Sequence, residues 1–497
     1  MTHVLLFAQV AETAAAPPVG RLIALLVFGI ALLLVLILRF KLQAFLSLLV
    51  VSLVVAATPG FLANLLGDNS PLAGANTVPL TQVADTIVKS MGSSLGFIAT
   101  VIGIGAIFGA ILEHSGGTQS LAKSLVRIFG ESRAPWAMLL TGFIISIPVF
   151  LDVALVILAP LLCALARDTK KPFLHFGLPL VVGMGVTHAF VPPTPGPVAV
   201  AYILGVNLGW VILYGVMVGL PTAIICGPWL CRKLANGIEI DESMLSANVV
   251  EESEDLPSFG FILFLIGFPI ALILGNTITE QVFAARLPDG LTNSQRKTEL
   301  VTALADSNIA TQLMLFLGHP VTALLIATLL ALYFLGTKRG VDRDTLLEVC
   351  TKALGPAGII ILITGAGGVF KGVLKETGIT DALAHLFGNS GIPTLVLAWV
   401  FATLIRVAQG SATVAMLTAA GLMVGFIEGL NQHQLALVTI AIAAGATGFS
   451  HVNDSGFWMI SRYFGMSESQ TLRSWSVLAT LISFIGFGLS LLLWQFV

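Results

Sequence analysis

The stretch from Phe176 to Leu204, FGLPLVVGMGVTHAFVPPTPGPVAVAYIL, decides how this chain folds. It is apolar and long enough to span a bilayer, which takes about 20 helical residues. Its middle is interrupted by Pro192-Pro193-Thr194-Pro195-Gly196-Pro197. Each proline inside a helix removes a backbone hydrogen bond, and this run exceeds what a simple kink requires. The stretch therefore predicts a membrane helix that is unwound near the bilayer midplane.

Three other apolar stretches are interrupted in comparable ways. Residues 435–464 are broken at Ser450-His451-Val452-Asn453-Asp454-Ser455-Gly456, which predicts a second broken helix. Residues 134–166 contain Pro148 and Asp152, and residues 392–429 contain Arg406 and Gln409-Gly410-Ser411. Both are long enough to cross the bilayer once and a half, so we expect two re-entrant hairpins.

The rest of the chain has the composition of an integral membrane protein. Of its 497 residues, 56% are hydrophobic and 10% are charged, against about 25% charged in an ordinary soluble domain. The net charge of -2 gives no reason to expect nucleic acid as a partner. We predict an all-α polytopic membrane protein, with uninterrupted spans at 22–38, 42–57, 97–112, 210–230, 259–274, 314–335, 357–374 and 476–497.

An internal repeat relates the two halves of the chain, and the interruptions coincide in both copies. Duplicated halves of this kind are typical of secondary transporters. The matched residues are Gly103, Gly105, Phe108 and Leu112 with Gly365, Gly367, Phe370 and Leu374; Pro135 with Pro393; and Gly185, Thr187 and Gly196 with Gly445, Thr447 and Gly456.

The distribution of Lys and Arg orients the two copies, because basic loops stay in the cytoplasm. If each hairpin enters and leaves on one side, the first copy begins outside and the second inside, so the repeats are inverted. The basic loops are 39–41, 123–133, 167–171, 232–233, 338–343 and 462–473. The expected organisation is an external tail (1–20), a first membrane repeat (21–233), an acidic cytoplasmic linker (234–257) and a second membrane repeat (258–497).

Ionisable residues at membrane depth are costly to bury and are candidates for function. Arg406 lies just before Gly410 at the tip of the second hairpin, where small residues let a ligand approach the backbone. Its guanidinium can hold a carboxylate through two hydrogen bonds. The alternative is a structural counter-ion for a buried Asp such as Asp152. The substrate contacts that we expect in this hairpin are Arg406, Gln409, Gly410, Ser411 and Thr413.

The two helix breaks supply the remaining candidates. Asn453, Asp454 and Ser455 offer groups that bind sugar-acid hydroxyls or relay a proton, although Asn, Asp and Ser are also the favoured helix caps. Thr194 and Gly196 are the substrate contacts that we expect at the first break. The candidates for proton coupling are Asp454, Asp152, His188 and His451. A salt bridge for Asp152 and an ordinary hydrogen-bonded core position for each histidine are the alternatives.

No enzyme motif of the Walker A, H-E-x-x-H or paired CxxC kind occurs, so we expect neither an enzyme nor a cofactor or metal site. The four cysteines, Cys163, Cys226, Cys231 and Cys350, lie in or beside apolar runs without metal-ligand spacing. We interpret them as packing residues.

Three long motifs, Phe190–Pro197, Arg406–Ala415 and Ser450–Trp458, together with Leu317–Pro320, closely resemble the gluconate permease family of proton symporters. The likeness covers nearly the whole chain. It implies proton-coupled uptake of gluconate or a related aldonate, with D-serine or other small hydroxy acids carried by some members. It also implies membership of a broader ion-transporter superfamily, in which homodimers with hairpins and broken helices work as elevators. The family commonly has His in place of Thr194 and often Glu in place of Asp152.

The sequence thus predicts a proton-coupled carboxylate symporter, multi-pass in the lipid of the cell inner membrane, with its substrate between the hairpin tips and the helix breaks. The nearest alternative is a sodium-coupled carboxylate or D-serine/hydroxy-acid carrier, which freed carbonyls around Gly410 and Asn453 would serve. A channel would need a continuous polar pore, whereas polarity here gathers in two breaks. An intramembrane enzyme would turn over its substrate without transport.

Overall fold

The computed structural model describes residues 19–67, 72, 78–238, 255–288, 293–388 and 392–497. Every regular element in this part of the chain is a helix, and nine spans are long and apolar enough to cross a membrane. The prediction of an all-α polytopic membrane protein is confirmed. Most of the predicted tail (1–20) and of the acidic linker (234–257) falls outside the described residues.

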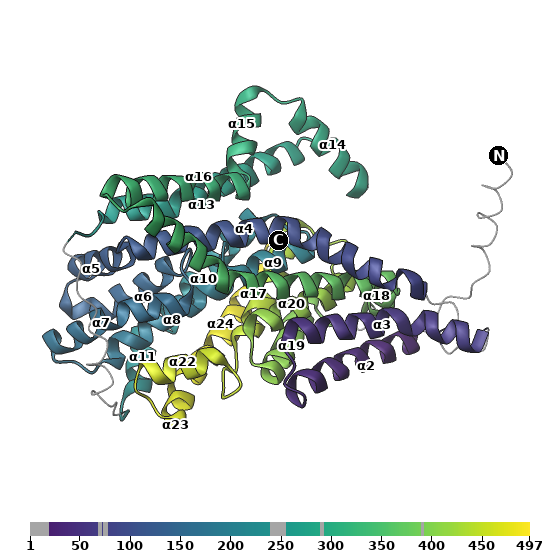
Figure 1. Cartoon of the computed structure of the whole chain (residues 1–497), viewed down its shortest axis with the longest axis horizontal. Helices are drawn as coiled ribbons and strands as arrows, with labels where there is room; N and C mark the ends of the chain where they lie inside the picture. Colours follow the sequence, from purple (N-terminus) through teal and green to yellow (C-terminus); the bar gives the residue numbers. More distant parts are fainter. Residues whose placement is uncertain (1–18, 68–71, 73–77, 239–254, 289–292, 389–391) are drawn as a thin grey trace.

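Figure 1 shows the helices running roughly along the long axis of the molecule, with α13 and α16 near one edge and α2 and α3 near the other. The N-terminal half contains α2 (Val19–Leu38), α3 (Ala44–Leu66), α4 (Val83–His114), α5 (Gly117–Phe129), α6 (Ala134–Ile145), α7 (Leu151–Thr169), α8 (Leu174–Phe190), α9 (Pro195–Leu204), α10 (Leu208–Ile225) and α11 (Pro228–Ala235).

The C-terminal half follows the linker, and its helices α14 and α15 project beyond the rest of the molecule (Figure 1). This half contains α13 (Phe259–Ala284), α14 (Asn293–Ala305), α15 (Ile309–Gly318), α16 (Pro320–Ala331), α17 (Arg343–Glu376), α18 (Ile379–Gly388), α19 (Thr394–Gln409), α20 (Ala412–Met423), α21 (Gln432–Thr447), α22 (Ser455–Tyr463), α23 (Glu468–Thr471) and α24 (Val477–Trp494).

All four predicted interruptions are present. The chain leaves helical conformation at 146–150 between α6 and α7, at 191–194 between α8 and α9, at 410–411 between α19 and α20, and at 448–454 between α21 and α22. Pro195 is the first residue of α9, where the missing N–H costs no hydrogen bond. The first helix break is shorter than expected, because Pro195–Pro197 already belong to α9. The second is as long as expected but begins two residues earlier, at Gly448, and both Arg406 and Ser455 are helical.

Three of the predicted spans differ clearly from the observed helices. α4 and α17 extend well beyond the apolar runs at 97–112 and 357–374, since their polar turns lie outside the most hydrophobic segment. The single span expected over 314–335 is divided, because Pro320 cannot continue a helix that ends at Gly318.

Corresponding helices of the two halves make corresponding contacts. α4 lies along α17; α3 packs on α17 as α16 packs on α4; and α2 packs on α18 as α13 packs on α5. The elbow after each long helix is a glycine with left-handed backbone, Gly116 (φ 76°) and Gly378 (φ 74°), a conformation that glycine adopts without strain. The predicted repeat therefore has a counterpart in the packing.

In both halves the first arm of the hairpin is pressed against the first part of the broken helix, α6 on α8 and α19 on α21. A Cβ atom on Gly183 of α8 would stand 2.1 Å from the Leu139 carbonyl oxygen of α6, and one on Gly445 of α21 would stand 2.4 Å from that of Trp399 in α19. Only glycine permits this approach, which holds each hairpin tip beside a helix break.

Candidate substrate site

A buried ion pair between Arg406 and Asp454 holds the second helix break together. Arg406 lies in the last turn of α19 and is 3% exposed, and Asp454 ends the break and is 9% exposed. The guanidinium pairs with the Asp454 carboxylate and also donates to the carbonyl oxygens of Gly410 and Gly448, the latter at 3.4 Å. Arg406 therefore ties the hairpin tip to both ends of the break.

The Asp454 carboxylate accepts three hydrogen bonds in the described structure. Its Oδ1 accepts from the Gly456 N–H at 2.9 Å, which caps α22, and its Oδ2 accepts from Arg406 and from the Ser450 hydroxyl. Ser450 in turn accepts from the Trp475 indole N–H at 3.0 Å. The expected capping role of Asp454 is present.

The hairpin tip and the helix break touch through backbone. Gly410 has left-handed backbone (φ 81°), and a Cβ there would stand 2.1 Å from the Asn453 carbonyl oxygen. The Asn453 amide donates to the Val407 carbonyl oxygen at 2.9 Å. The Asn453 side chain therefore connects the helix break to the hairpin through a hydrogen bond.

Gln409 is the polar residue of this tip whose side chain remains available. Its Oε1 and Nε2 are both shielded from solvent, and neither has a hydrogen-bond partner within the described residues. Ser411 caps α20 by accepting from the Val414 N–H at 3.4 Å. A buried amide without partners is costly, and a hydroxylated ligand would satisfy both of its atoms.

The first helix break is built mainly from backbone and proline. The Thr194 hydroxyl donates to the Val191 carbonyl oxygen at 2.7 Å and is buried. A Cβ on Gly196 would stand 2.6 Å from the Met416 sulfur of α20. The start of α9 therefore lies directly on the second hairpin, and this contact joins the two halves; α7 meets α22 in the same way.

Two adjoining cavities reach the first break and the tip of the first hairpin. A small one of about 20 Å³ is lined by His188 and Thr194 together with the tip, Ile147–Phe150. A larger one of about 260 Å³ shares Pro148, Val149 and Phe150 with it and extends to residues at the end of α4 and on α17. The lining at that far end includes Glu113, His114 and Lys352. The two cavities thus lie on either side of the same tip residues, the smaller one at the helix break and the larger one toward the end of α4.

The predicted residues fall into two groups. Arg406, Gln409, Gly410, Asn453 and Asp454 gather at the second break, whereas Thr194 and His188 line the cavity at the first. Four predicted residues have other surroundings: His451 pairs through Nδ1 with the Phe449 carbonyl oxygen at 2.8 Å, Ser455 is exposed, Thr413 is half-buried on α20, and the Asp152 side chain lies outside the described residues.

Sequence reasoning missed several members of these groups. The described partner of Arg406 is Asp454, whereas the sequence left Asp152 as a possible counter-ion. Ser450 lies in a motif that was recognised, but no role was predicted for it. Trp475 was not predicted as a neighbour of Ser450, because it lies 25 residues further along the chain. The hairpin residues 147–150 are apolar apart from their backbone, so no residue type marked them as a cavity wall.

Comparison with known proteins identifies the family. A model of the GntP family permeases matches residues 21–497. The gluconate permease of Bacillus subtilis is 37% identical over 472 residues, which cover 94% of this chain and 97% of that protein. The low-affinity gluconate transporter of Escherichia coli is 36% identical (92% and 95% covered), and the Gnt-II system L-idonate transporter of the same organism is 34% identical (92% and 95% covered).

Solved structures of other transporters share the fold. The YdaH transporter of Alcanivorax borkumensis superposes with a TM-score of 0.58 at 14% identity, covering 91% of this chain and 98% of its own. MtrF of Neisseria gonorrhoeae gives a TM-score of 0.57 at 13% identity, covering 90% and 94%. Full-length similarity to permeases and the many membrane spans make this chain a multi-pass transporter of the cell membrane and not an enzyme. It belongs to the GntP family of permeases.

Proposed function

We propose that this permease takes up gluconate or a closely related aldonate together with protons. The observation that carries the proposal is the 34–37% identity, over more than nine-tenths of the chain, to proteins named for gluconate and for L-idonate. Both compounds are polyhydroxylated carboxylates, so the common feature is a chain of hydroxyl groups ending in one negative charge.

The substrate site in this proposal lies between the two hairpin tips and the two helix breaks. Gln409 supplies a donor and an acceptor for hydroxyl groups, because both of its amide atoms lack partners in the described structure. Thr194, Ser411, Thr413, Asn453 and Ser455 supply further polar groups, and Gly196 and Gly410 allow close approach. Arg406 has its guanidinium engaged by Asp454 and two carbonyls, so its role is to position the site.

Alternating access is proposed to follow an elevator mechanism of two inverted repeats in a homodimer. The reciprocal packing of α3 on α17 and α16 on α4 supports two equivalent halves. The cavity of about 260 Å³ begins where α4 ends and α17 starts, beside the basic loops that the positive-inside rule assigns to the cytoplasm. With this sidedness, we propose that the structure represents an inward-facing state.

Uptake by the purified protein in liposomes tests the proposal. A proton gradient directed inward, in sodium-free buffer, is expected to drive accumulation of radiolabelled gluconate, and unlabelled L-idonate is expected to compete. Uptake that depends on sodium at fixed pH would instead establish the sodium-coupled alternative. If D-serine competes and aldonates do not, the substrate belongs to the other small hydroxy acids.

A further inference from the structure

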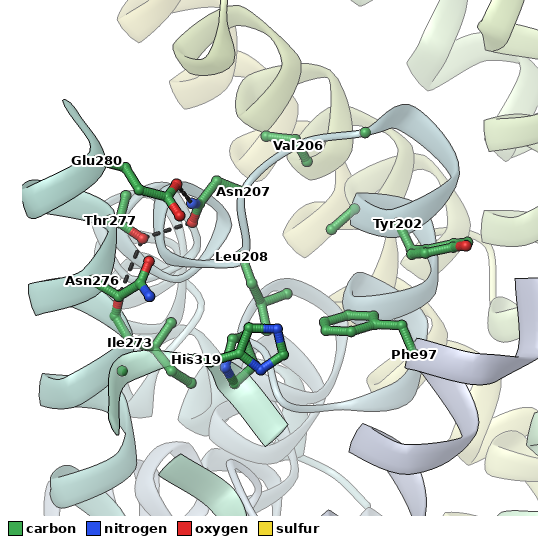
Figure 2. Close-up of a pocket in the computed structure, with 14 residues that line it drawn as sticks. Phe97, Tyr202, Val206, Asn207, Leu208, Ile273, Asn276, Thr277, Glu280 and His319 are labelled. Carbon is green, nitrogen blue, oxygen red and sulfur yellow. Dashed lines mark hydrogen bonds between the residues drawn. The ribbon is translucent and has the colours of Figure 1, made fainter. Parts of the chain in front are cut away.

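A second polar cavity lies outside the proposed substrate site. It has a volume of about 370 Å³ and is bounded by α4, α13, the connector between α9 and α10, and the turn before α16. Figure 2 shows Glu280, Thr277 and Asn207 converging at one side of it, with Phe97 and Tyr202 at the other. This cluster contains a half-buried carboxylate, Glu280, to which the substrate site gives no role.

Three hydrogen bonds fasten the connector (205–208) to α13 and order its own turn. The Asn207 amide donates to the Glu280 carboxylate at 2.6 Å, and the Thr277 hydroxyl donates to the Asn207 carbonyl oxygen at 2.6 Å. The same Asn207 oxygen accepts from the Gly209 N–H at 2.9 Å and so caps α10. We call this arrangement of Asn207, Thr277 and Glu280 the connector clamp.

Neighbouring helices also hold the backbone on both sides of the connector clamp. A Cβ on Gly209 would stand 2.0 Å from the Thr277 hydroxyl oxygen, so the first turn of α10 lies directly on α13. On its other side the connector is held by Gln432 of α21, which accepts from the Asn207 N–H at 2.7 Å and donates to the Gly205 carbonyl oxygen at 3.2 Å. The bonds from Asn207 to Thr277 and Glu280 therefore tie the chain segment that follows α9 to α13.

Glu280 has no ion-pair partner within the described residues. The other charged and titratable groups around it are engaged elsewhere. These are Arg296 of α14, which donates to the Ala284 carbonyl oxygen; His433 of α21, which pairs with the Tyr214 hydroxyl; His319, which meets the Phe97 ring; and Lys371 of α17, which donates to the Ile203 carbonyl oxygen.

The carboxylate also has access to water. An adjoining cavity of about 820 Å³ shares Asn207, Thr277 and Glu280 with the first and extends past Arg296 to the start of α21. Under the positive-inside assignment this is the external side. A carboxylate that lines such a cavity and has no cation partner among the described residues is neutralised most simply by a proton from that side.

We propose that Glu280 is a proton-binding site of the transport cycle and that its proton releases the connector clamp. With Glu280 charged, the bond from Asn207 is charge-assisted and holds α9 to α13. With Glu280 neutral, this bond weakens, and the first broken helix is free to move against α13. External protons thereby permit the conformational step that carries substrate. The inference rests on the proposed proton symport and names a coupling site for it.

The test uses Glu280→Gln in liposomes, because glutamine keeps an acceptor for Asn207 but cannot titrate. Gradient-driven accumulation of labelled gluconate is expected to fall by about ten-fold or more, within the range of typical coupling between sites. Exchange of labelled for unlabelled gluconate, which moves no net protons, is expected to persist and to lose its dependence on external pH. Glu299→Gln, an exposed carboxylate on α14, is the matched control and should behave as the wild type.

Thr277→Val distinguishes the loss of a hydrogen bond of the connector clamp from the loss of the titratable group. It removes one bond of the clamp but no titratable group, so accumulation and its pH dependence should both remain. Normal accumulation and an unchanged pH profile in Glu280→Gln would overturn the proposal, and so would equal loss of accumulation and exchange in a variant with normal thermal stability. Wild-type accumulation under a proton gradient, measured in the same vesicles, tests symport separately; without it both proposals fall.

Discussion

At the scale of single residues, Arg406 and Asp454 make the strongest prediction about the second break. Removing one charge from a buried pair leaves the other uncompensated, which costs about 3–5 kcal/mol. Asp454→Asn is therefore expected to lower the melting temperature of the detergent-purified protein and to lose accumulation and exchange together. If Asp454 were the proton carrier, Asp454→Asn would lose accumulation but keep exchange. Persistence of exchange in this variant would therefore contradict a structural role for the Arg406–Asp454 pair.

The double variant Arg406→Gln/Asp454→Asn provides the control for this pair. It removes both charges and leaves two neutral amides, so it is expected to recover part of the melting temperature lost in Asp454→Asn. A double variant that is less stable than either single variant would show that the guanidinium contacts to Gly410 and Gly448 outweigh the ion pair.

Gln409 makes the opposite kind of prediction, since its side-chain amide has no hydrogen-bond partner within the described residues, whereas Arg406 is engaged. Gln409→Leu is expected to weaken gluconate binding by about ten-fold, the equivalent of one lost hydrogen bond of ~1.4 kcal/mol. Its melting temperature without ligand should not fall, because no bond within the described protein is removed. Titration calorimetry gives the affinity, and Gln495→Leu, at an exposed position, is the control. Unchanged affinity would show that Gln409 does not contact the substrate.

At the scale of elements, the contact between the second hairpin and the second break depends on Gly410. Gly410→Ala places a methyl group on the Asn453 carbonyl and adds the left-handed penalty of about 1–2 kcal/mol. Gly429→Ala has the same φ of 81° with open space around it, and so reports the penalty alone. We expect Gly410→Ala to abolish uptake and Gly429→Ala to retain it; equal effects would mean that the close approach is unimportant.

The start of α17 gives a pH-dependent prediction outside the membrane span. The Thr345 hydroxyl and N–H donate to the Asp342 carboxylate at 2.6 and 2.8 Å, which lowers its pKa. Because the folded-state pKa lies below the unfolded value of about 3.9, this stabilisation is present above that pH and is lost as pH falls through the folded pKa.

Asp342→Ser tests this sign, because serine caps a helix without titrating near pH 4. The melting temperature of the wild type should exceed that of the variant at neutral pH, and the difference should shrink on acidification. A difference that remains constant down to pH 3 would show that the charge of Asp342 contributes nothing.

At the scale of the whole molecule, the inverted-repeat proposal predicts opposite entry sides for the two hairpins. In a cysteine-free background, a cysteine at exposed Ser132, just before α6, should react with impermeant reagent from the cytoplasmic side. A cysteine at exposed Ile392, just before α19, should react from the external side. Reaction of both from one side would make the repeats parallel and refute the assignment.

The packing of the whole molecule also connects the proposed substrate site with the connector clamp. The start of α9 lies on α20 through Gly196 and Met416, so a movement of α9 is transmitted to the second hairpin. The connector clamp sits at the other end of the same helix α9. A release at the clamp and a rearrangement at the substrate site are therefore mechanically joined through one short helix.

The sequence alone determined the membrane class, the four interruptions and the family motifs, because these depend on local composition. A run of prolines breaks a helix, and an apolar run of sufficient length spans a bilayer, whatever surrounds them. The same holds for the cap at Asp454, whose bond reaches only two residues along the chain.

Only the tertiary structure decided which charged and polar groups meet. Arg406 pairs with Asp454 because α19 and α21 pack through Gly445, and Glu280 meets Asn207 because α10 begins on α13. Neither pairing has a sequence signal, since the partners are far apart in the chain and their residue types would suit many other partners. A buried polar group must find some partner, but packing chooses which one.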